Sequence, residues 1–489
     1  MQIVKIILCS LLLGLFGGNS FAQIDSMSNG HLFIHYNSAQ THRFINVNHV
    51  ANKDSSVLNN LALWLYATKG TDTALSIQKA IGYNDFTPGP DATMTIPNNF
   101  LKVQKMSGAE IKDHAAAYRQ NNYTPTENIL NWPGSINGNN YAAFVDFNNN
   151  AVYEPQNGDY PLIRGDQSFV RVENDKQTTN RNSTMQPVGI EAVQNFFIFP
   201  NAGDPIMDNV LGFRWVLKNV SGKDWDTVLA GVNFHGSVSA NNYISTDVDN
   251  NAMMIYAKDN TARQFASVVL LNQKLSSSHY YTNSVGNQNG IPSKNADFVN
   301  YINGRWINGK NLTRGNTGVD GINRTNFVFP NTTLSDTAWN EDAEGNLSGN
   351  RSGLLVSKFT NWQNGTYQVI EGAFMYCQKV DSFSYIYEKH RNLVNAYKSN
   401  RYTDISTEIE NKIEIFPNPV VNLGNIQVTS SVYEIEEIKI IDMSGKVINS
   451  LQFNQRNVSL DMAACKKGLY FLSLRLQNKT TKIFPIAII

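Results

Sequence analysis

Oxygen-bearing side chains alternate along one short stretch of the chain in a way that suits a hard cation. Asp146, Asn148 and Asn150 stand at its first, third and fifth positions, and Glu154 stands at the ninth. Calcium takes about six to eight oxygen ligands, and a backbone carbonyl such as that of Val152 can supply one of them. The spacing therefore predicts a calcium-binding loop.

Two positions show that this loop is not an EF-hand. Ala151 stands where an EF-hand has its glycine, and Asn157 stands where it has a bidentate glutamate. We therefore expect a looser site of the extracellular type, with Asp159 as a late ligand. The alternative is an asparagine-rich turn whose side chains bond to their own backbone.

Other metal and cofactor sites are weaker or absent in the pattern. Asp247, Asp249 and Asp259 form a second acidic cluster, which could line a cation or sugar site or be a solvated loop. His31 and His35 fall on one predicted strand, about 13 Å apart, so they cannot share a zinc ion. No Walker loop or Gly-x-Gly-x-x-Gly turn occurs, and no nucleotide cofactor is predicted.

No catalytic residue can be assigned from the sequence. A Gly-x-Ser-x-Gly nucleophile turn is missing. Glycoside hydrolysis needs two carboxylates roughly 5–9.5 Å apart, which only the fold can provide. The candidates are Glu154, Glu173, Asp175 and Glu191, and the sequence does not rank them. The 7 tryptophans could stack on sugar rings, although large aromatic side chains more often belong to a core.

Composition limits the class of protein. The chain of 489 residues has 40 basic and 40 acidic side chains, which argues against nucleic-acid binding driven by net charge. Apolar residues make up 42% of the chain, enough for a buried core. Frequent asparagine and 33 glycines favour turns, and hence many short strands over long helices.

Residues 1–22 have the organisation of a secretory signal peptide. Lys5 precedes an apolar stretch, and Ser20-Phe21-Ala22 fits a small-x-small cleavage site. The apolar stretch is shorter than the roughly 20 residues that span a bilayer, and no later segment is long enough, so we expect no transmembrane span in the mature chain. That chain would hold two cysteines, Cys377 and Cys465, which we expect to be separate thiols; a disulfide is the alternative.

Residues 23–405, called the body below, have the pattern of a β-rich extracellular region. Strand-like stretches cover residues 195–199, 212–218 and 367–376. Two helices are expected, one after a capping box at Ser107 and one over residues 388–398. The predicted fold is mainly β, with one or two packed sandwiches and minor helices.

Residues 412–489, called the tail below, change to short alternating strands with tight turns. Pro417 and Pro419 remove two backbone donors after the strand that ends at Phe416, so this segment must be an edge or a cap. Asp442 and Gly445 bound a turn in which the glycine takes a positive φ. The pattern predicts a small Ig-like β-sandwich that folds as a separate domain.

The tail resembles the type A C-terminal sorting domain of the Bacteroidetes type IX secretion system. The resemblance rests on three pieces in order: Phe416-Pro417-Asn418-Pro419, Asp442-Met443-Ser444-Gly445-Lys446 and Lys467-Gly468-Leu469-Tyr470. It implies that the type IX machinery binds this domain and exports the chain to the cell surface or the medium.

The body is similar to a family of large, uncharacterised secreted Bacteroidetes proteins that carry the same sorting domain. Matching pieces include residues 84–90, 131–134, 144–150, 158–167, 300–306 and 326–330. Where the family has Gly-Asp-Arg-Arg, this chain has Gly349-Asn350-Arg351-Ser352. The resemblance implies an architecture and no mechanism.

Together these patterns predict an exported protein with a structural, adhesive or glycan-binding role. The alternative is an extracellular hydrolase that acts on polysaccharide. A cleft with two convergent carboxylates would favour the hydrolase, and a flat or convex surface with scattered tryptophans would favour binding. The expected partners are the type IX machinery and a glycan or cell-surface ligand, without nucleic acid.

Overall fold

The computed structural model describes most of the chain in two compact units. The predicted signal peptide and Asp259 lie outside the described residues. One unit comprises Met1–Ser107, Glu127–Ala143 and Pro161–Asp404, and the other comprises Gly108–Thr126, Phe144–Tyr160 and Ile405–Ile489. The described residues are 24–37, 44–49, 52–78, 83–91, 95–148, 150–177, 181–199, 207–257, 263–330, 339–380, 383–398, 413–420, 424–430, 434–463, 465–476 and 481–488.

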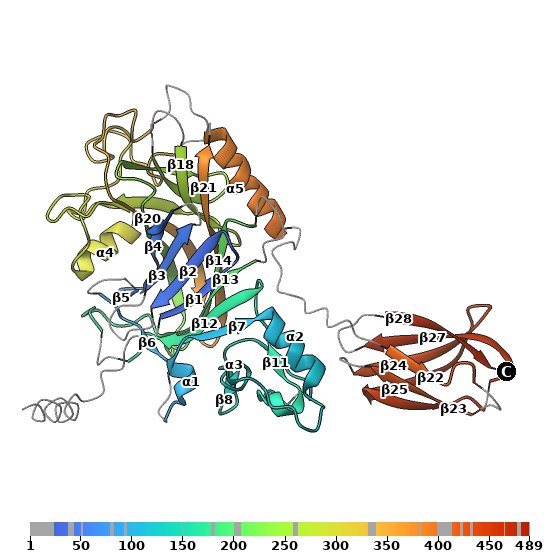
Figure 1. Cartoon of the computed structure of the whole chain (residues 1–489). Coiled ribbons are helices and arrows are strands. Elements are labelled where there is room, and N and C mark those ends of the chain that lie inside the picture. The colour runs from blue at the N-terminus through green and yellow to red at the C-terminus, as the bar shows by residue number, and fades with distance from the viewer. Residues whose placement is uncertain are drawn as a thin grey trace, which may run out of the picture. The chain divides into compact units, whose positions relative to one another are not determined.

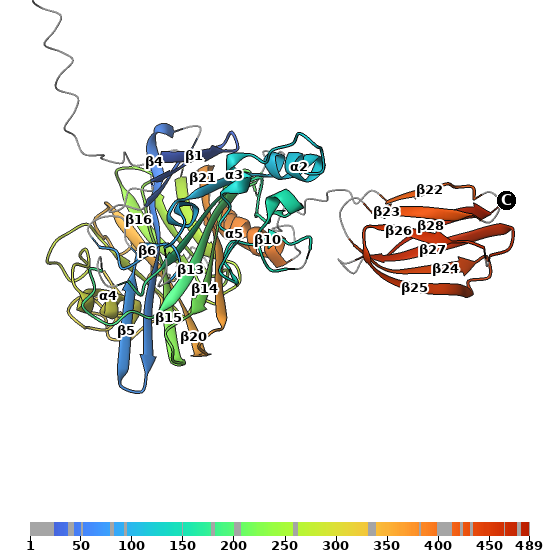
Figure 2. The same ribbon diagram turned by 90° about the horizontal axis from the view of Figure 1, so that it is seen from below.

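Two large antiparallel sheets face each other in the first unit (Figures 1 and 2). The eight-stranded sheet has the order β1-β2-β3-β4-β15-β20-β19, with β5 paired to β4. Its strands are β1 (Ile24–Ser28), β2 (Leu32–Asn37), β3 (Phe44–His49), β4 (Asn52–Lys69), β5 (Asp72–Ile77), β15 (Trp225–Gly236), β19 (Ser277–Tyr281) and β20 (Arg351–Trp362).

The nine-stranded sheet has the order β16-β17-β18-β21-β14-β13-β12-β6, with β7 paired to β12. Its strands are β6 (Thr87–Pro88), β7 (Gln104–Ser107), β12 (Gln167–Asn174), β13 (Ile190–Ile198), β14 (Val210–Asn219), β16 (Asn242–Asp247), β17 (Ala252–Ala257), β18 (Arg263–Leu270) and β21 (Tyr367–Val380). The three strands expected from the sequence are therefore confirmed as β13, β14 and β21.

Short elements complete the chain ahead of the tail. The helix expected after Ser107 is confirmed as α2, and the last helix, α5, begins five residues earlier than expected. These elements are α1 (Asn98–Leu101), α2 (Gly108–Ala117), α3 (Glu127–Leu130), β8 (Ser135–Ile136), β9 (Asn139–Asn140), β10 (Phe144–Val145), the 3-10 turn η1 (Pro155–Asn157), β11 (Tyr160–Pro161), α4 (Asn295–Ile302) and α5 (Phe383–Lys398).

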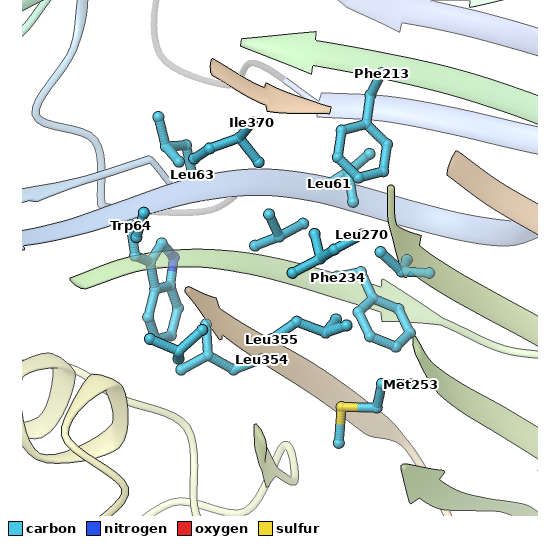
Figure 3. Close-up of a cluster of buried hydrophobic side chains, with 14 of the residues drawn as sticks. Leu61, Leu63, Trp64, Phe213, Phe234, Met253, Leu270, Leu354, Leu355 and Ile370 are labelled. Carbon is cyan, nitrogen blue, oxygen red and sulfur yellow. The ribbon is translucent and has the colours of Figure 1, made fainter. Parts of the chain in front are cut away.

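Alternating apolar side chains build the core between the two sheets. Along β14, Leu211, Phe213, Trp215 and Leu217 all join one buried cluster, as the two-residue period of a strand requires. Figure 3 shows this cluster where the sheets meet, with Leu61 and Phe234 from the eight-stranded sheet and Phe213, Met253, Leu270 and Ile370 from the other. The two large sheets of the first unit thus share one core.

Two aromatic rings lie directly over core glycines, one in each sheet. Phe234 pairs with Gly353 across β15 and β20, and Phe213 pairs with Gly372 across β14 and β21. A Cβ at Gly353 would lie 2.2 Å from the Phe234 ring, and one at Gly372 would lie 2.3 Å from the Phe213 ring. Both glycines are therefore required by packing.

Other elements cover the outer faces of the sheets. On the nine-stranded sheet, Leu393 and Ile386 of α5 bury apolar side chains that the sandwich leaves outside its core. On the eight-stranded sheet, the long connection between β19 and β20 carries α4, whose Phe298 packs edge-on against Trp64 with ring centroids 5.0 Å apart. Because β4 is covered on both faces, Leu63, Trp64 and Leu65 are buried in succession.

The tail has the predicted two-sheet form. A three-stranded sheet, β22-β23-β26, is joined by a four-stranded sheet, β25-β24-β27-β28. Val428, Ile438 and Leu472 belong to a buried cluster drawn wholly from the tail, so the tail has a hydrophobic core of its own. Its strands are β22 (Ile413–Phe416), β23 (Asn425–Ser430), β24 (Ile435–Asp442), β25 (Val447–Gln455), β26 (Asn457–Asp461), β27 (Gly468–Leu476) and β28 (Thr481–Ile488).

The cysteines are separate thiols and the tryptophans belong to the core, which is in each case one of the two alternatives expected from the sequence. Cys377 and Cys465 are free thiols that pack in different clusters. All the tryptophans are buried, with at most 2% of each exposed, so none offers a surface for stacking on sugar.

We predict that Gly353→Ala lowers the free energy of unfolding by about 2–3 kcal/mol, because the new methyl group overlaps the Phe234 ring. Chemical denaturation of the single variants and of the Phe234→Leu/Gly353→Ala double variant measures this effect. A smaller side chain at position 234 should recover part of the loss. Strict additivity of the two substitutions would contradict the proposed clash.

Candidate functional site

A polar pocket of about 640 Å³ lies where the connection between β19 and β20 begins and ends. The two strands are antiparallel neighbours, with Tyr281 opposite Ser352, so both ends of the connection come to the same place. The beginning contributes Thr282 to the lining, the middle contributes Thr317, and the end contributes Glu341. Sheet register therefore assembles this pocket from segments far apart in the sequence.

Amide and hydroxyl groups with unused hydrogen-bonding capacity face this pocket. Asn283, Asn287 and Asn350 line it and are exposed. Across the part of the chain that the structure describes, these three amides and the Ser284 hydroxyl form no side-chain hydrogen bond. Each amide can both donate and accept, so the pocket suits a ligand rich in hydroxyl groups.

A buried ion pair, Glu341 with Arg351, lies at the base of the pocket. The Glu341 Oε1 accepts from Arg351 Nε and Nη2, each at 2.9 Å, and its Oε2 accepts from the backbone N–H of Ile244 at 2.6 Å. Burial raises the pKa of Glu341 to about 7, and the favourable charge of Arg351 offsets this shift only in part.

Arg351 also shapes the pocket wall. Its Nη1 donates to the carbonyl of Asn350 at 3.1 Å, and its Nη2 donates to the carbonyl of Leu347. The guanidinium carbon lies 5.8 Å from the centre of the Tyr280 ring. The segment Gly349-Asn350-Arg351-Ser352 thus places its arginine in a structural role and its asparagine in the pocket.

Glu341 is the single acidic residue among those that line this pocket. Both of its carboxylate oxygens accept hydrogen bonds within the protein. Glycoside hydrolysis by the usual route needs two carboxylates that face the scissile bond. The arrangement supports binding through amides and hydroxyls better than it supports acid–base chemistry.

None of the four carboxylates suggested by the sequence lines the polar pocket. Glu173 accepts a hydrogen bond from Gln78 at 2.8 Å, and Asp175 accepts one from Ser76 at 2.6 Å, both inside the sandwich. Glu191 accepts from the backbone N–H of Asp91 at 3.0 Å. Glu154 belongs to the other unit.

The predicted calcium loop folds as a network of turns. The two carboxylate oxygens of Asp146 accept from the backbone N–H groups of Asn150 and Ala151. The amide nitrogens of Asn148 and Asn150 both donate to Glu154 Oε2, at 3.1 and 2.7 Å. These bonds are those expected of the alternative, an asparagine-rich turn whose side chains bond within the loop. A carboxylate oxygen that accepts one hydrogen bond keeps a second lone pair that can bind a cation.

Asp159 closes this loop from its far end. Its carboxylate accepts from the N–H of Phe147 at 2.9 Å and from that of Glu154 at 2.8 Å. Val152, whose backbone carbonyl is the expected further ligand, is 44% exposed. No group of three or more His, Cys, Asp or Glu side chains among the described residues is arranged to hold a metal, and calcium binding by this loop stays a prediction.

The two described members of the second acidic cluster, Asp247 and Asp249, lie beside α5. The carboxylate of Asp247 accepts from Asn250 and lies 2.9 Å from His390 Nδ1, which ties α5 to the end of β16. Asp247 and Asp249 both line a separate pocket of about 510 Å³, together with Glu388 of α5. The sequence did not indicate that α5 contributes to this cluster.

The sorting-motif residues converge at one end of the tail. The Asn418 side chain donates to the carbonyl of Pro485 at 3.0 Å and accepts from the N–H of Ala487 at 3.1 Å, so it clamps the end of β28. Tyr470 lies at the start of β27 opposite Ile486 and opposite Asp442 at the end of β24. Three pieces that are separate in the sequence therefore form one surface region.

The turn at this end has the predicted form. Asp442 Oδ1 accepts from the N–H groups of Ser444 and Lys446, at 2.8 and 3.1 Å, and Gly445 has φ +85°. Gly468 begins β27, and Phe416, 75% exposed, ends β22 before the two prolines Pro417 and Pro419. Residues 414–486 match the family described as the secretion system C-terminal sorting domain.

The tail is a type IX sorting domain. The chain is therefore a cargo of the type IX secretion machinery, and its sorting domain indicates export to the cell surface or the extracellular space. Among the described residues, no helix has the length and apolar character that crossing a membrane requires.

Comparisons of the whole chain with known proteins are less informative than the match to the sorting domain. No relative is found among curated proteins. Similarity to a polysaccharide lyase has 8% identity and a TM-score of 0.24, over 97% of this chain and 47% of that chain. A mutant of the heparan sulfate lyase HepC from Pedobacter heparinus gives 11% identity and a TM-score of 0.23, over 91% and 43%. The chain spans less than half the length of these proteins, and TM-scores this low do not indicate a shared fold.

We predict that removing calcium with EDTA lowers the melting temperature of the chain. At about 1 mM calcium and a Kd of about 0.1 mM, the bound ion would contribute about 1.4 kcal/mol. Differential scanning calorimetry with and without EDTA checks this, with Asp146→Asn expected to reduce the EDTA effect and the exposed Asp113→Asn expected to preserve it. A melting temperature that EDTA leaves unchanged would show that the loop does not bind calcium.

We also predict that Glu341 makes stability fall as pH rises from about 4.5 to 7. The folded protein keeps the Glu341 proton up to a pKa of about 7, whereas the unfolded chain releases it near 4.5, so unfolding releases a proton in this window. Urea unfolding of the wild type and of Glu341→Gln across this range measures the effect. From the lower to the upper pH, the wild type should lose up to about 3 kcal/mol more unfolding free energy than the variant. Parallel pH profiles would refute the assignment.

Proposed function

We propose that the exported body is a binding protein that holds a neutral glycan in the pocket between β19 and β20. The observation that carries this proposal is the set of amide and hydroxyl groups that line the pocket without partners in the described part of the chain. Neighbouring sugar hydroxyls can each accept and donate, which matches asparagine side chains such as Asn283 and Asn350. Export to the cell surface or medium would bring such a pocket to extracellular polysaccharide.

Charge at the pocket supports an uncharged ligand. Glu341 and Arg351 are the charged residues of the lining, and they neutralise each other in a buried pair. A uronic acid or sulfated sugar would have to separate Arg351 from Glu341 to gain a counter-ion. Breaking a buried pair costs about 3–5 kcal/mol, so an acidic sugar is disfavoured.

The alternative, a hydrolase acting on polysaccharide, has weaker support. The pocket offers one carboxylate where the usual mechanism needs two, and that carboxylate is bonded to Arg351 and to the backbone of Ile244. The pKa of Glu341, raised to about 7, is the feature that favours it, since a general acid needs such a value. Direct measurement of products separates the two.

We predict that the chain binds neutral polysaccharide and that the pocket asparagines carry this binding. Replacing Asn283, Asn287 and Asn350 by alanine should weaken binding about fivefold for each hydrogen bond lost, since one such bond is worth about 1 kcal/mol. Affinity electrophoresis against glucans, mannans and xylans, with pectate and heparin as acidic counterparts, measures this. Asn323→Ala is the matched control, because Asn323 is exposed on the same connection and outside the pocket.

Two outcomes of this binding panel would contradict the proposal. Equal retention of the wild type and the triple variant would show that the pocket is not the binding site. New reducing ends or unsaturated sugars in the incubated polysaccharide would establish catalysis and favour the alternative.

A further inference from the structure

Three aliphatic side chains on the connection between β19 and β20 are almost fully exposed. Val285 is 87% exposed, Ile322 97% and Leu347 89%. The other large apolar side chains exposed in the described part of the first unit range from 37% to 54%. Single exposed apolar residues are common, but three extreme cases on one connection are not expected from chance scatter.

Hydrogen bonds hold the segments that carry these side chains together. Asn316 accepts from the Asn346 amide at 3.3 Å and donates its N–H to Glu344 at 2.8 Å, which joins the segment before Ile322 to the segment of Leu347. Tyr280, just ahead of the Val285 segment, donates to the carbonyl of Thr317 at 3.4 Å. The three tips therefore belong to one folded structure.

Two arginines flank the most exposed of the three tips. The N–H of Arg314 donates to the carbonyl of Asn323 at 2.8 Å, and Thr313 forms a bridge with Arg324, so both arginines lie on the hairpin that carries Ile322. Both are exposed, and neither forms an ion pair with any described residue. The nearby acid Asp320 is paired with Lys310 at 3.6 Å.

We propose that this loop-tip surface, formed by Val285, Arg314, Ile322, Arg324 and Leu347, docks on an anionic lipid surface. Isolated aliphatic tips gain free energy only when they leave water, and insertion among lipid chains buries each one without a shaped partner. The flanking arginines supply the attraction to anionic headgroups. A protein partner is less suited, because interface anchors are typically aromatic and form a contiguous patch, whereas these tips are aliphatic and separate.

This inference does not depend on what the polar pocket binds. Leu347 also lines the pocket, whereas Val285, Arg314, Ile322 and Arg324 do not, so the decisive substitutions are made at those four positions and leave the pocket lining unchanged. Failure of lipid docking and failure of glycan binding are therefore separate results.

Flotation with vesicles tests the proposal, using the chain from Gln23 to Ile489. The wild type should bind vesicles of phosphatidylcholine mixed with phosphatidylglycerol more tightly than vesicles of phosphatidylcholine alone, and added salt should weaken the binding. Val285→Ser with Ile322→Ser should lower partitioning at least about tenfold on the mixed vesicles. Arg314→Gln and Arg324→Gln should each lower it about fivefold there and leave phosphatidylcholine vesicles unaffected.

Matched controls keep the interpretation clear. Tyr367→Ser removes an exposed apolar side chain, and Lys358→Gln removes an exposed cation, both elsewhere on the sandwich, and neither should change binding. Thermal melts confirm that every variant is folded. Equal vesicle binding by the wild type and the Val285→Ser/Ile322→Ser variant would overturn the proposal. So would a wild type whose self-association is lost in that variant while vesicle binding is unchanged, since the tips would then be an interface between copies of the chain.

Discussion

Apolar burial between two large sheets is the constraint on which the body of this protein depends. The chain has no net charge at pH 7 and its described cysteines are free, so neither overall charge nor a disulfide substitutes for packing. The fit is close enough that Phe234 and Phe213 each require a glycine opposite. Because this packing fixes the register of β19 against β20, it also fixes where their long connection starts and ends. The position of the pocket therefore follows from the packing of the core.

Two opposing effects meet at Glu341, and their balance explains its role. Burial disfavours the carboxylate and Arg351 favours it, and the pKa of about 7 shows that burial is the larger effect. A buried ion pair of this kind adds little net stability, because the loss of hydration offsets most of the attraction. What the pair does provide is position: it joins the backbone of β16 at Ile244 to the wall that contains Leu347 and Asn350.

The sequence predicted features that local chemistry determines and missed those that depend on register. The turn at Gly445 and the strands of the sandwich follow from short patterns, and both are confirmed. The pocket was not predicted, because Asn283 and Asn350 come together only through the pairing of Tyr281 with Ser352. A signal was present in the dense asparagine, serine and glycine of residues 282–290 and 345–350, but the same composition is typical of solvated loops.

Two pieces of the body that stand out in the sequence also have a structural explanation that no local pattern revealed. Asp85, within the piece 84–90, accepts the backbone N–H groups of Ile77, Asn182 and Ser183 at 2.8–3.1 Å. Asp159 does the same for two N–H groups of the asparagine-rich loop. In each case one carboxylate satisfies buried donors that no strand partner reaches, and leaving such donors unpaired would cost about 1–3 kcal/mol each. Such carboxylates resemble a catalytic set in sequence, although their oxygens are already occupied by the backbone N–H groups of the loops that they hold.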